Sequence, residues 1–534
     1  MEQIRNRLGE SRLCQRVFII LMIIYGAAGL FLFDDYGCGP DEGMERQTSL
    51  VNFRYALHKL NLPVSEKAET WMEYLPELKE YRDRYYGTAL HFPLVLAEYF
   101  SDFTLSPAQF YGLRHLYTFL NYYVGVICVY RLLVSRFRSH CAGLAGALMM
   151  ILTPRLFGES FYNNKDLIFL AWYVICTLLS DRWLKKRSLK LSVLLAFGLA
   201  LTCNTRFNGI IFIPVLVFLF LFDGFRKKNF SGWQKLILTL LLSLIFFCLI
   251  TPNFWENPVQ TLFETVQFNM HHPNHGSAGN LFKGVLVDAS KTLTYIPVWI
   301  AVTVPTVYLL FTLAGACWYL VSIVRSAVGF RLNDIDLTDV LLFLTGFGAV
   351  IFIILTHVTI YNGWRHCYFA YPCFVYFAVY FLWNIFRKKA VFLPAVCFVL
   401  LCVSFVWNGV WIVRNHPFEY VYFITPIQDR VTDFSGDYWS IGSRALLEYI
   451  TDSDPERMLM VNHAHSQAGS INRGLLPEEK RQYLVLTYED TPDVDYYIVC
   501  RDEIGTVDVV PDGYEKVFSV AVDKDEIGAV FKKK

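Results

Sequence analysis

The sequence predicts an all-α polytopic membrane protein of about eleven transmembrane helices, with a small C-terminal extracytoplasmic α/β domain. The 534 residues are 54% hydrophobic and only 18% charged, whereas soluble proteins carry about 25% charged residues. Several apolar runs approach the length of about 20 residues that crosses a hydrocarbon core of roughly 30 Å. Beyond residue 413 such runs stop, and short segments with strand-like composition replace them.

Apolar runs identify the candidate spans. They are 17–33, 112–134, 140–154, 166–180, 190–203, 208–224, 236–252, 295–323, 337–357, 367–386 and 390–413. The runs at 140–154, 166–180 and 190–203 are short, so hydropathy alone does not decide whether they cross. No small-residue cleavage site follows the first run, which is therefore interpreted as a retained helix.

The distribution of Lys and Arg orients these spans. With a cytoplasmic N-terminus, most Lys and Arg of the connecting loops fall in the cytoplasmic connections and few in the short outer ones. The positive-inside rule requires this asymmetry, which appears only if the short spans cross. An odd number of spans then places the C-terminal tail outside a multi-pass protein of the cell membrane.

Two outer segments are large, and they define the expected domains. Residues 1–413 would form the transmembrane module, whose first outer loop, 34–111, is expected to carry amphipathic helices near Ser49–Leu60 and Glu69–Arg84. Residues 414–534 would form the extracytoplasmic α/β domain. Its predicted strands are 458–464, 482–488, 496–500 and 516–522, and its predicted helices lie at Arg444–Ile450 and near Pro477.

Charge and cysteine content exclude several function classes. The net charge is +1 and no patch combines basic with aromatic residues, so nucleic acid is not an expected partner. Most of the 13 Cys lie in apolar runs, where Cys behaves as a small hydrophobe. Cys38 and Cys500 lie in polar segments, so a bridge between them is conceivable, although nothing supports it. No CxxC or Cys/His spacing typical of a metal site occurs.

The chemically suggestive side chains gather at the outer ends of the predicted helices. They are Asp34, Asp35, Asp41, Glu42, Asn163, Asn164, Lys165, Asp166, Asn204, Arg206, Asn208, His271, His272, His275, Arg365 and His366. Charged groups at membrane depth are costly, so their clustering on one face indicates function. Carboxylates suit a general base, and Arg, Lys and His suit a phosphate leaving group. A lipid-phosphate donor at the outer surface would need this mixture.

The order of these motifs resembles the GT-C superfamily of polyprenol-dependent glycosyltransferases. Within it, the chain is similar to dolichyl-phosphate-mannose protein mannosyltransferases and bacterial aminoarabinose transferases. The marks are Asp41-Glu42 after the first helix, the NNKD stretch at 163–166 and YNGWRH at 361–366. The segments HPFEYVYF (416–423) and DYW (437–439) are similar to the start of the outer domain in bacterial members.

This resemblance implies an integral membrane glycosyltransferase with an inverting mechanism. It would transfer a hexosyl or pentosyl group from a polyprenyl-phosphate-linked sugar to a lipid, glycan or protein acceptor on the outer face. Asp41 would be the base, Glu42 its neighbour or an acceptor-binding group, and Asp166 a second acid. The substrate-binding candidates are Asn164, Lys165, Arg206, Arg365 and His366. No cofactor is expected, and a divalent metal is possible but not favoured, because the branch that the chain resembles generally uses none. The absence of Asp-x-Asp from the first outer loop agrees with this expectation.

Each motif also has a structural interpretation. Asp41-Glu42 and Asn163–Asp166 could cap helices, and Arg206 and Arg365 could reach from the bilayer to the interface. The histidines at 271–275 fit a structural or acceptor loop better than zinc, since no Cys or carboxylate partner is evident.

Two other function classes stay open. One is a secondary transporter, although transporters carry charge near the bilayer midplane and often show repeats, whereas the spans here are nearly free of acids and show no visible repeat. The other is a non-catalytic GT-C relative that keeps the fold for binding or assembly.

Overall fold

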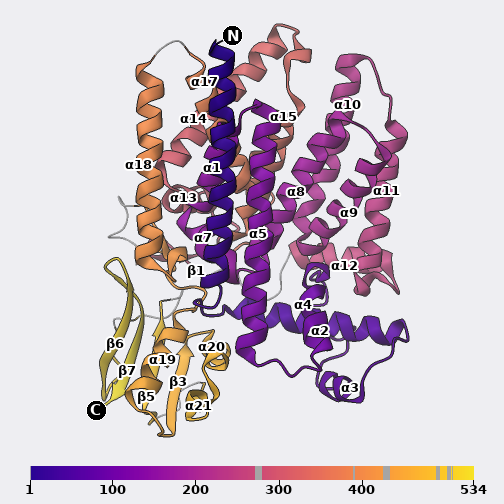
Figure 1. The fold of residues 1–534 in the computed structure, drawn as a ribbon. Helices are drawn as coiled ribbons and strands as arrows, with labels where there is room; N and C mark the ends of the chain where they lie inside the picture. The colour runs from indigo at the N-terminus through magenta and orange to yellow at the C-terminus, as the bar shows by residue number, and fades with distance from the viewer. Residues whose placement is uncertain are drawn as a thin grey trace.

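The computed structural model describes residues 2–270, 279–388, 391–424, 433–488, 493–501, 507 and 509–534. It is a multi-pass membrane protein built on a bundle of long apolar helices (Figure 1). Within the described residues, nine segments are long and apolar enough to cross a membrane, or up to ten if a bent pair counts as one span. The nine are Arg12–Leu32, Pro107–Phe137, Asp166–Lys185, Phe207–Lys227, Trp233–Ile250, Thr306–Val328, Leu337–Leu355, Arg365–Phe386 and Phe392–Asn415.

The bundle is assembled from helices that follow the predicted runs closely. They are α1 (Glu2–Leu32), α5 (Pro107–Phe137), α6 (His140–Ile151), α7 (Pro154–Tyr162), α8 (Asp166–Lys185), α9 (Leu189–Thr205), η2 (Phe207–Ile211), α10 (Phe212–Lys227), α11 (Trp233–Ile250), α13 (Tyr295–Thr303), α14 (Thr306–Val328), α15 (Leu337–Phe343), η5 (Leu344–Gly348), α16 (Ala349–Leu355), η6 (Arg365–Ala370), α17 (Tyr371–Phe386) and α18 (Phe392–Asn415). Shorter connecting elements are η3 (Pro252–Phe254), α12 (Pro258–Met270) and η4 (Leu332–Asp334).

Two of the short predicted runs, 140–154 and 190–203, account for the difference between about eleven predicted spans and the nine or ten found among the described residues. The run at 140–154 becomes α6 and α7, which meet at 68°, with Pro154 opening the second helix. The run at 190–203 becomes α9, whose 17 residues lie at the lower limit for crossing a bilayer. The run at 295–323 is interrupted before α14, because Pro305 has no N–H to donate within a helix.

The first outer loop folds into a small helical layer of α2 (Pro40–Lys59), α3 (Glu66–Met72), η1 (Ala89–His91) and α4 (Phe92–Phe100). The predicted helix at 49–60 is confirmed, and it starts earlier, at Pro40. The predicted helix at 69–84 is wrong beyond Met72. Pro76 interrupts it, since proline blocks the helical conformation of the residue before it, and turns follow.

The C-terminal segment contains a five-stranded sheet in the order β4-β3-β5-β7-β6. Its strands are β3 (Leu459–His465), β4 (Leu484–Thr487), β5 (Tyr496–Cys500), β6 (Tyr514–Val522) and β7 (Asp525–Lys533). The first three pair in parallel, and β7 pairs antiparallel with β5 and β6. The four predicted strands are confirmed, but β7 was not predicted. Helices η7 (Glu419–Val421), α19 (Ser443–Ser453), α20 (Gly469–Leu475) and α21 (Glu478–Arg481) complete the segment.

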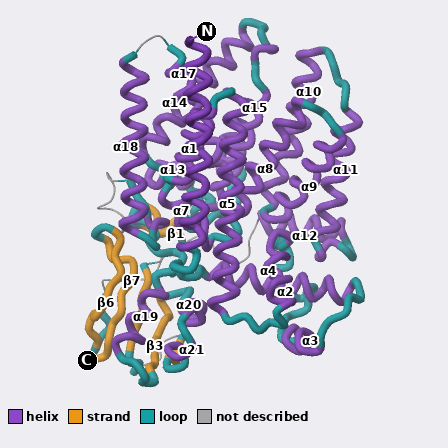
Figure 2. The backbone as a smooth tube through the Cα atoms, viewed as in Figure 1, coloured by secondary structure: helices purple, strands orange, loops and turns teal. Residues whose placement is uncertain are grey.

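Figure 1 shows that α2–α4 and the sheet lie at the same end of the bundle, opposite the N-terminus. The tube in Figure 2 shows the same division, with the long strands confined to that end. A small hairpin of β1 (Asn280–Phe282) and β2 (Val285–Val287) joins the sheet segment through a bridge between Phe282 and Phe434. The polar residues of the first outer loop therefore lie at the same end of the bundle as the sheet.

A single hydrophobic core connects the bundle to the C-terminal segment. Tyr420, Tyr438 and Trp439 are almost completely buried, in the same cluster as Tyr162 of α7. The sheet is thus held against the bundle by packed aromatic side chains, which contribute much of the burial energy at such contacts.

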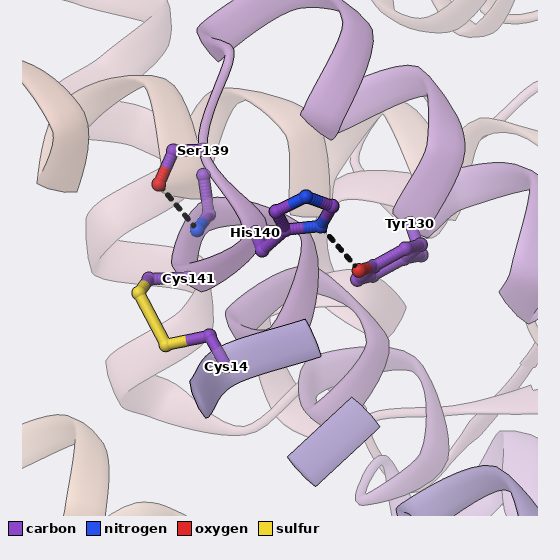
Figure 3. Close-up of a disulfide and its surroundings, with 6 residues drawn as sticks. Cys14, Tyr130, Ser139, His140 and Cys141 are labelled. Carbon is purple, nitrogen blue, oxygen red and sulfur yellow. Dashed lines mark hydrogen bonds between the residues drawn. A yellow bond between two sulfur atoms is a disulfide. The ribbon is translucent and has the colours of Figure 1, made fainter. Parts of the chain in front are cut away.

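A disulfide lies near the start of the first apolar span (Figure 3). It joins Cys14 of α1 to Cys141 of α6, whose Cα atoms are 5.2 Å apart. A bridge between Cys38 and Cys500 is not formed, so that sequence-based possibility is wrong. Position in the sequence could not reveal the observed pair, because helix packing brings Cys14 and Cys141 together.

Candidate active site

The first turn of α2 presents Asp41 at the end of the bundle. Pro40 opens the helix, where a missing N–H costs nothing. The backbone N–H of Gly39 donates to Glu42 at 3.0 Å and secures the turn. Acidic residues are favoured at this position by the helix dipole. The capping interpretation therefore applies to Glu42, and it leaves the Asp41 carboxylate available for other contacts.

Arg365 brings two of the predicted acids together. Its Nη1 donates to Asp41 at 2.7 Å and lies 3.6 Å from the Asp166 carboxylate. Asp166 also forms an ion pair with Arg206. These four residues come from α2, α8, the end of α9 and η6, so the network joins four separate elements.

Lys165 extends the network through an acid that the sequence analysis did not select. It forms a buried ion pair with Glu45 of α2 and lies 3.6 Å from the Tyr86 ring centroid. Glu45 also lies 3.7 Å from Nε2 of His91. Glu45 follows Asp41 by four positions, which places both on one helical face. That spacing was the signal that could have identified it.

Asparagines shape the turn that carries Lys165 and Asp166. The Asn163 side chain accepts from the backbone N–H of Asp166, the first residue of α8, at 3.0 Å. Asn164 is 1% exposed, and its Nδ2 has no hydrogen-bond partner among the described residues. The same holds for Nε of Arg206 and of Arg365. Buried donors without partners are uncommon in folded proteins, and they indicate a place where a ligand or water completes the bonding.

Glu42 points away from this network. Its carboxylate lies 3.1 Å from Nε2 of His115 on α5 and is 1% exposed. Asp41 and Glu42 are neighbours in a helix with 3.6 residues per turn, so their side chains diverge by about 100°. The structure therefore does not bring Glu42 together with Asp41, Asp166 and Arg365.

Asp41 differs from the other acids in exposure and in charge environment. Its side chain is 29% exposed, whereas that of Asp166 is 1% exposed. Burial works to raise the pKa of Asp41, but Arg365, followed by Lys165 and Arg206, outweighs burial and holds that pKa below its ordinary value. Asp41 is therefore ionised at neutral pH and accessible to a substrate.

A pocket that is open to solvent adjoins the network through Lys165 and Arg206. Its polar wall includes Lys165, Arg206 and His366, and its apolar wall includes Phe247 and Ile353. His366 packs edge-on against Tyr361, with ring centroids 4.6 Å apart. Cationic and apolar walls in one cavity suit a ligand with an anionic head and a hydrocarbon chain.

Two aromatic residues pack against Arg365, and the sequence analysis selected neither of them as a site residue. The guanidinium lies 4.8 Å from the Tyr361 ring centroid and 4.6 Å from that of Trp439. Trp439 comes from the DYW stretch of the C-terminal segment, and only the folded chain places it there. The histidines at 271, 272 and 275 lie outside the described residues.

Comparison with known proteins supports the predicted resemblance. Residues 114–254 match the sequence profile of the family described as dolichyl-phosphate-mannose-protein mannosyltransferase. The predicted resemblance is confirmed over this segment. The mannosyltransferase-like segment contains Asn164, Lys165, Asp166 and Arg206, whereas Asp41 and Arg365 lie outside it. No curated protein matches the chain.

Two solved structures are similar in outline. Both are crystal structures of ArnT from Cupriavidus metallidurans, one bound to undecaprenyl phosphate and one in the apo state. Each is 11% identical to this chain with a TM-score of 0.45. The alignment covers 96% of this chain and 97% of the bound form, and 97% and 98% for the apo form.

Proposed function

We propose that this protein is a membrane glycosyltransferase that moves a sugar from a polyprenyl-phosphate carrier to an acceptor hydroxyl on the outer face of the membrane. The mannosyltransferase-like segment supports the reaction class, and its family description makes a mannosyl donor the first to test. The observation that carries the proposal is the Arg365 bridge. It joins Asp41 to Asp166 beside a cavity with both cationic and apolar walls.

Asp41 is the proposed general base. As the acceptor oxygen attacks the anomeric carbon, its proton passes to the Asp41 carboxylate. The bond from the anomeric carbon to the phosphate oxygen breaks, and the polyprenyl phosphate leaves with the electron pair. This single displacement inverts the anomeric centre and forms no covalent enzyme intermediate.

Lys165 and Arg206 are the proposed contacts of the donor phosphate. Both line the cavity, and Arg206 keeps an unpaired Nε donor among the described residues. Positive charge there favours departure of the phosphate, because negative charge accumulates on its oxygens as the bond breaks. The polyprenyl chain would lie along the apolar wall, toward the bilayer.

Asp166 and Arg365 are proposed as positioning residues. Asp166 is almost fully buried between Arg206 and Arg365, so it has little access to a substrate. It holds the two guanidinium groups at a fixed separation. Arg365 in turn orients Asp41 and keeps its carboxylate ionised.

The proposal is tested by transfer from a panel of radiolabelled polyprenyl-phosphate sugars in membranes, with wild type compared with Asp41→Asn. We expect sugar-dependent turnover that falls at least about a hundredfold in the variant, the loss typical of a missing general base. The matched control is Asp34→Asn, since Asp34 lies in the same loop and joins no ion pair among the described residues. Turnover unchanged in Asp41→Asn would overturn the assignment of the base. Absence of turnover with every donor would overturn the reaction class.

A further inference from the structure

A second polar cluster lies buried behind the first turn of α2. It contains the thiol of Cys38, the carboxylate of Glu42 and the imidazole of His115, which come from the loop after α1, from α2 and from α5. One potential ligand atom from each residue lies within 4.8 Å of the other two, and all three residues are buried. The proposed transfer reaction uses none of them.

The separations between these atoms lie within a few tenths of an ångström of those around a tetrahedral zinc ion. Sγ of Cys38 lies 3.8 Å from Nε2 of His115, and that nitrogen lies 3.1 Å from the Glu42 carboxylate. Zn–S bonds of about 2.3 Å and Zn–N or Zn–O bonds of about 2.0–2.2 Å imply ligand-to-ligand distances of roughly 3.3–3.6 Å. Thiolate, imidazole and carboxylate together are a donor set that zinc accepts.

The surroundings orient each ligand. Nδ1 of His115 lies 3.0 Å from the carbonyl oxygen of Phe33, which can only accept a hydrogen bond. The proton is therefore on Nδ1, and the Nε2 lone pair can point to a metal, as in many metal-bound histidines. Oε1 of Glu42 accepts from the N–H of Gly39, while the buried Oε2 lies 3.1 Å from Nε2 of His115 and accepts no hydrogen bond from any other described residue.

Cys38 is held in place by the C-terminal segment. Its backbone N–H donates to Oδ1 of Asn472 at 2.8 Å, and its carbonyl accepts from Nδ2 of the same residue at 2.9 Å. Asn472 belongs to α20, so a bond at Cys38 would couple three parts of the fold: α2, α5 and the C-terminal segment. This arrangement resembles a structural metal site that ties separate segments together.

We propose that Cys38, Glu42 and His115 form a structural zinc site, with a water in the fourth position. Binding of Zn²⁺ displaces the thiol proton of Cys38 and leaves His115 neutral, so the charges of thiolate and carboxylate balance the ion. The site would fix the first turn of α2, in which Asp41 precedes Glu42. The sequence alone did not indicate this zinc site, because His115 lies 73 residues beyond Glu42.

Zinc content of the full-length protein tests this proposal. Protein purified in detergent without chelator is analysed by elemental mass spectrometry, and we expect about one zinc per chain. Cys38→Ser and His115→Gln should each lose most of this zinc. The matched control is Cys128→Ser, because Cys128 lies on α5 like His115 but outside the cluster. Unchanged zinc in both ligand variants would overturn the proposal.

A measurement on wild type alone covers the case in which the variants do not fold. Zinc is removed with a chelator and replaced by Co²⁺, whose thiolate bond gives a charge-transfer absorption band. We expect that band, and its disappearance on addition of Zn²⁺. A metal-free wild type, or bound cobalt without the band, would overturn the proposal and leave Glu42 and His115 as a buried ion pair. Neither zinc content nor the cobalt absorption band depends on transfer activity. A negative result for the zinc site is therefore distinguishable from a negative result for the proposed glycosyltransferase function.

Discussion

Nη1 of Arg365 donates to the carboxylate of Asp41 at 2.7 Å, although 324 residues separate them in the chain. The same nitrogen lies 3.6 Å from Asp166. One buried cation therefore compensates two acids, and several properties of the protein depend on it.

Replacing Arg365 should destabilise the fold strongly. Arg365→Met leaves the carboxylates of Asp41 and Asp166 without their shared partner, and breaking a buried ion pair costs about 3–5 kcal/mol. Arg365→Lys keeps the positive charge but loses the planar guanidinium that places Nη1 near both acids, so it should lose less stability. Thermal unfolding in detergent measures both. The control is Arg457→Ala, whose exposed pair with Asp495 should be worth less than about 1 kcal/mol. Equal losses in Arg457→Ala and Arg365→Met would contradict the prediction.

Stability should fall between pH 7 and pH 5 because of His91. Burial, aided by Arg114 and Lys165, lowers the pKa of His91 to about 3 from its ordinary 6.5, and these effects outweigh Glu45 at 3.7 Å. Between these values the unfolded chain binds the proton and the folded protein does not, so acid favours unfolding. The cost is about 2 kcal/mol at pH 5.

Comparing unfolding of wild type and His91→Gln at the two pH values measures this effect. The variant should lose less stability on acidification, whereas His58→Gln, which changes a half-exposed histidine on α2, should behave as wild type does. A pH dependence unaltered in His91→Gln would show that other groups cause it.

Lys165→Gln should weaken donor binding. Loss of a charged hydrogen bond costs about 1.5–3 kcal/mol, so KM for the polyprenyl-phosphate donor should rise roughly tenfold to a hundredfold. Steady-state kinetics with varied donor measures the change. Lys283→Gln, on the exposed turn of the β1–β2 hairpin, serves as control and should leave KM unaltered. A fall in kcat with KM unchanged would argue against a phosphate contact at Lys165.

Gly37→Ala should disturb the contact between the first outer loop and the C-terminal segment. A Cβ at Gly37 would lie 2.3 Å from the carbonyl oxygen of Ile441 and 2.8 Å from Oδ1 of Asn472. Such overlap costs about 1–3 kcal/mol, and it should increase proteolysis of the C-terminal segment. Gly43→Ala is the control, because its nearest atom would be 3.5 Å away and alanine favours the helix. Similar proteolysis of both variants would contradict the prediction.

The Cys14–Cys141 pair tests the predicted orientation. A cytoplasmic N-terminus predicts that both thiols are reduced in intact cells, because cytosolic thiols are kept reduced. Rapid alkylation before lysis, followed by peptide mass spectrometry, measures the fraction bridged. We expect alkylated Cys14 and Cys141 from cells and the disulfide of Figure 3 after oxidation of the purified protein. A bridged pair in cells would place the N-terminal end in an oxidising compartment.

Much of the fold was predictable because long spans and short strands depend on local composition. The apolar runs became helices of the bundle, and four of the five strands of the sheet were found. The strand β7 was missed because Gly528 and the charged residues at its ends obscure the pattern, and only pairing with β5 and β6 makes it a strand. The predicted helix does not continue beyond Met72, because Pro76 disfavours the helical conformation of the residue before it.

The sequence by itself determined that this is a membrane protein and that acids and bases gather at one end of its helices. It also identified Asp41, Asp166, Arg206 and Arg365 as candidates, from their clustering at the outer ends of the helices and from the resemblance to the GT-C superfamily. Tertiary structure decided which charges meet. Adjacent residues of α2 face different neighbours, so Asp41 contacts Arg365 while Glu42 contacts His115. The neighbour that each face of α2 contacts depends on how helices far apart in the chain pack together. Local sequence does not specify this packing.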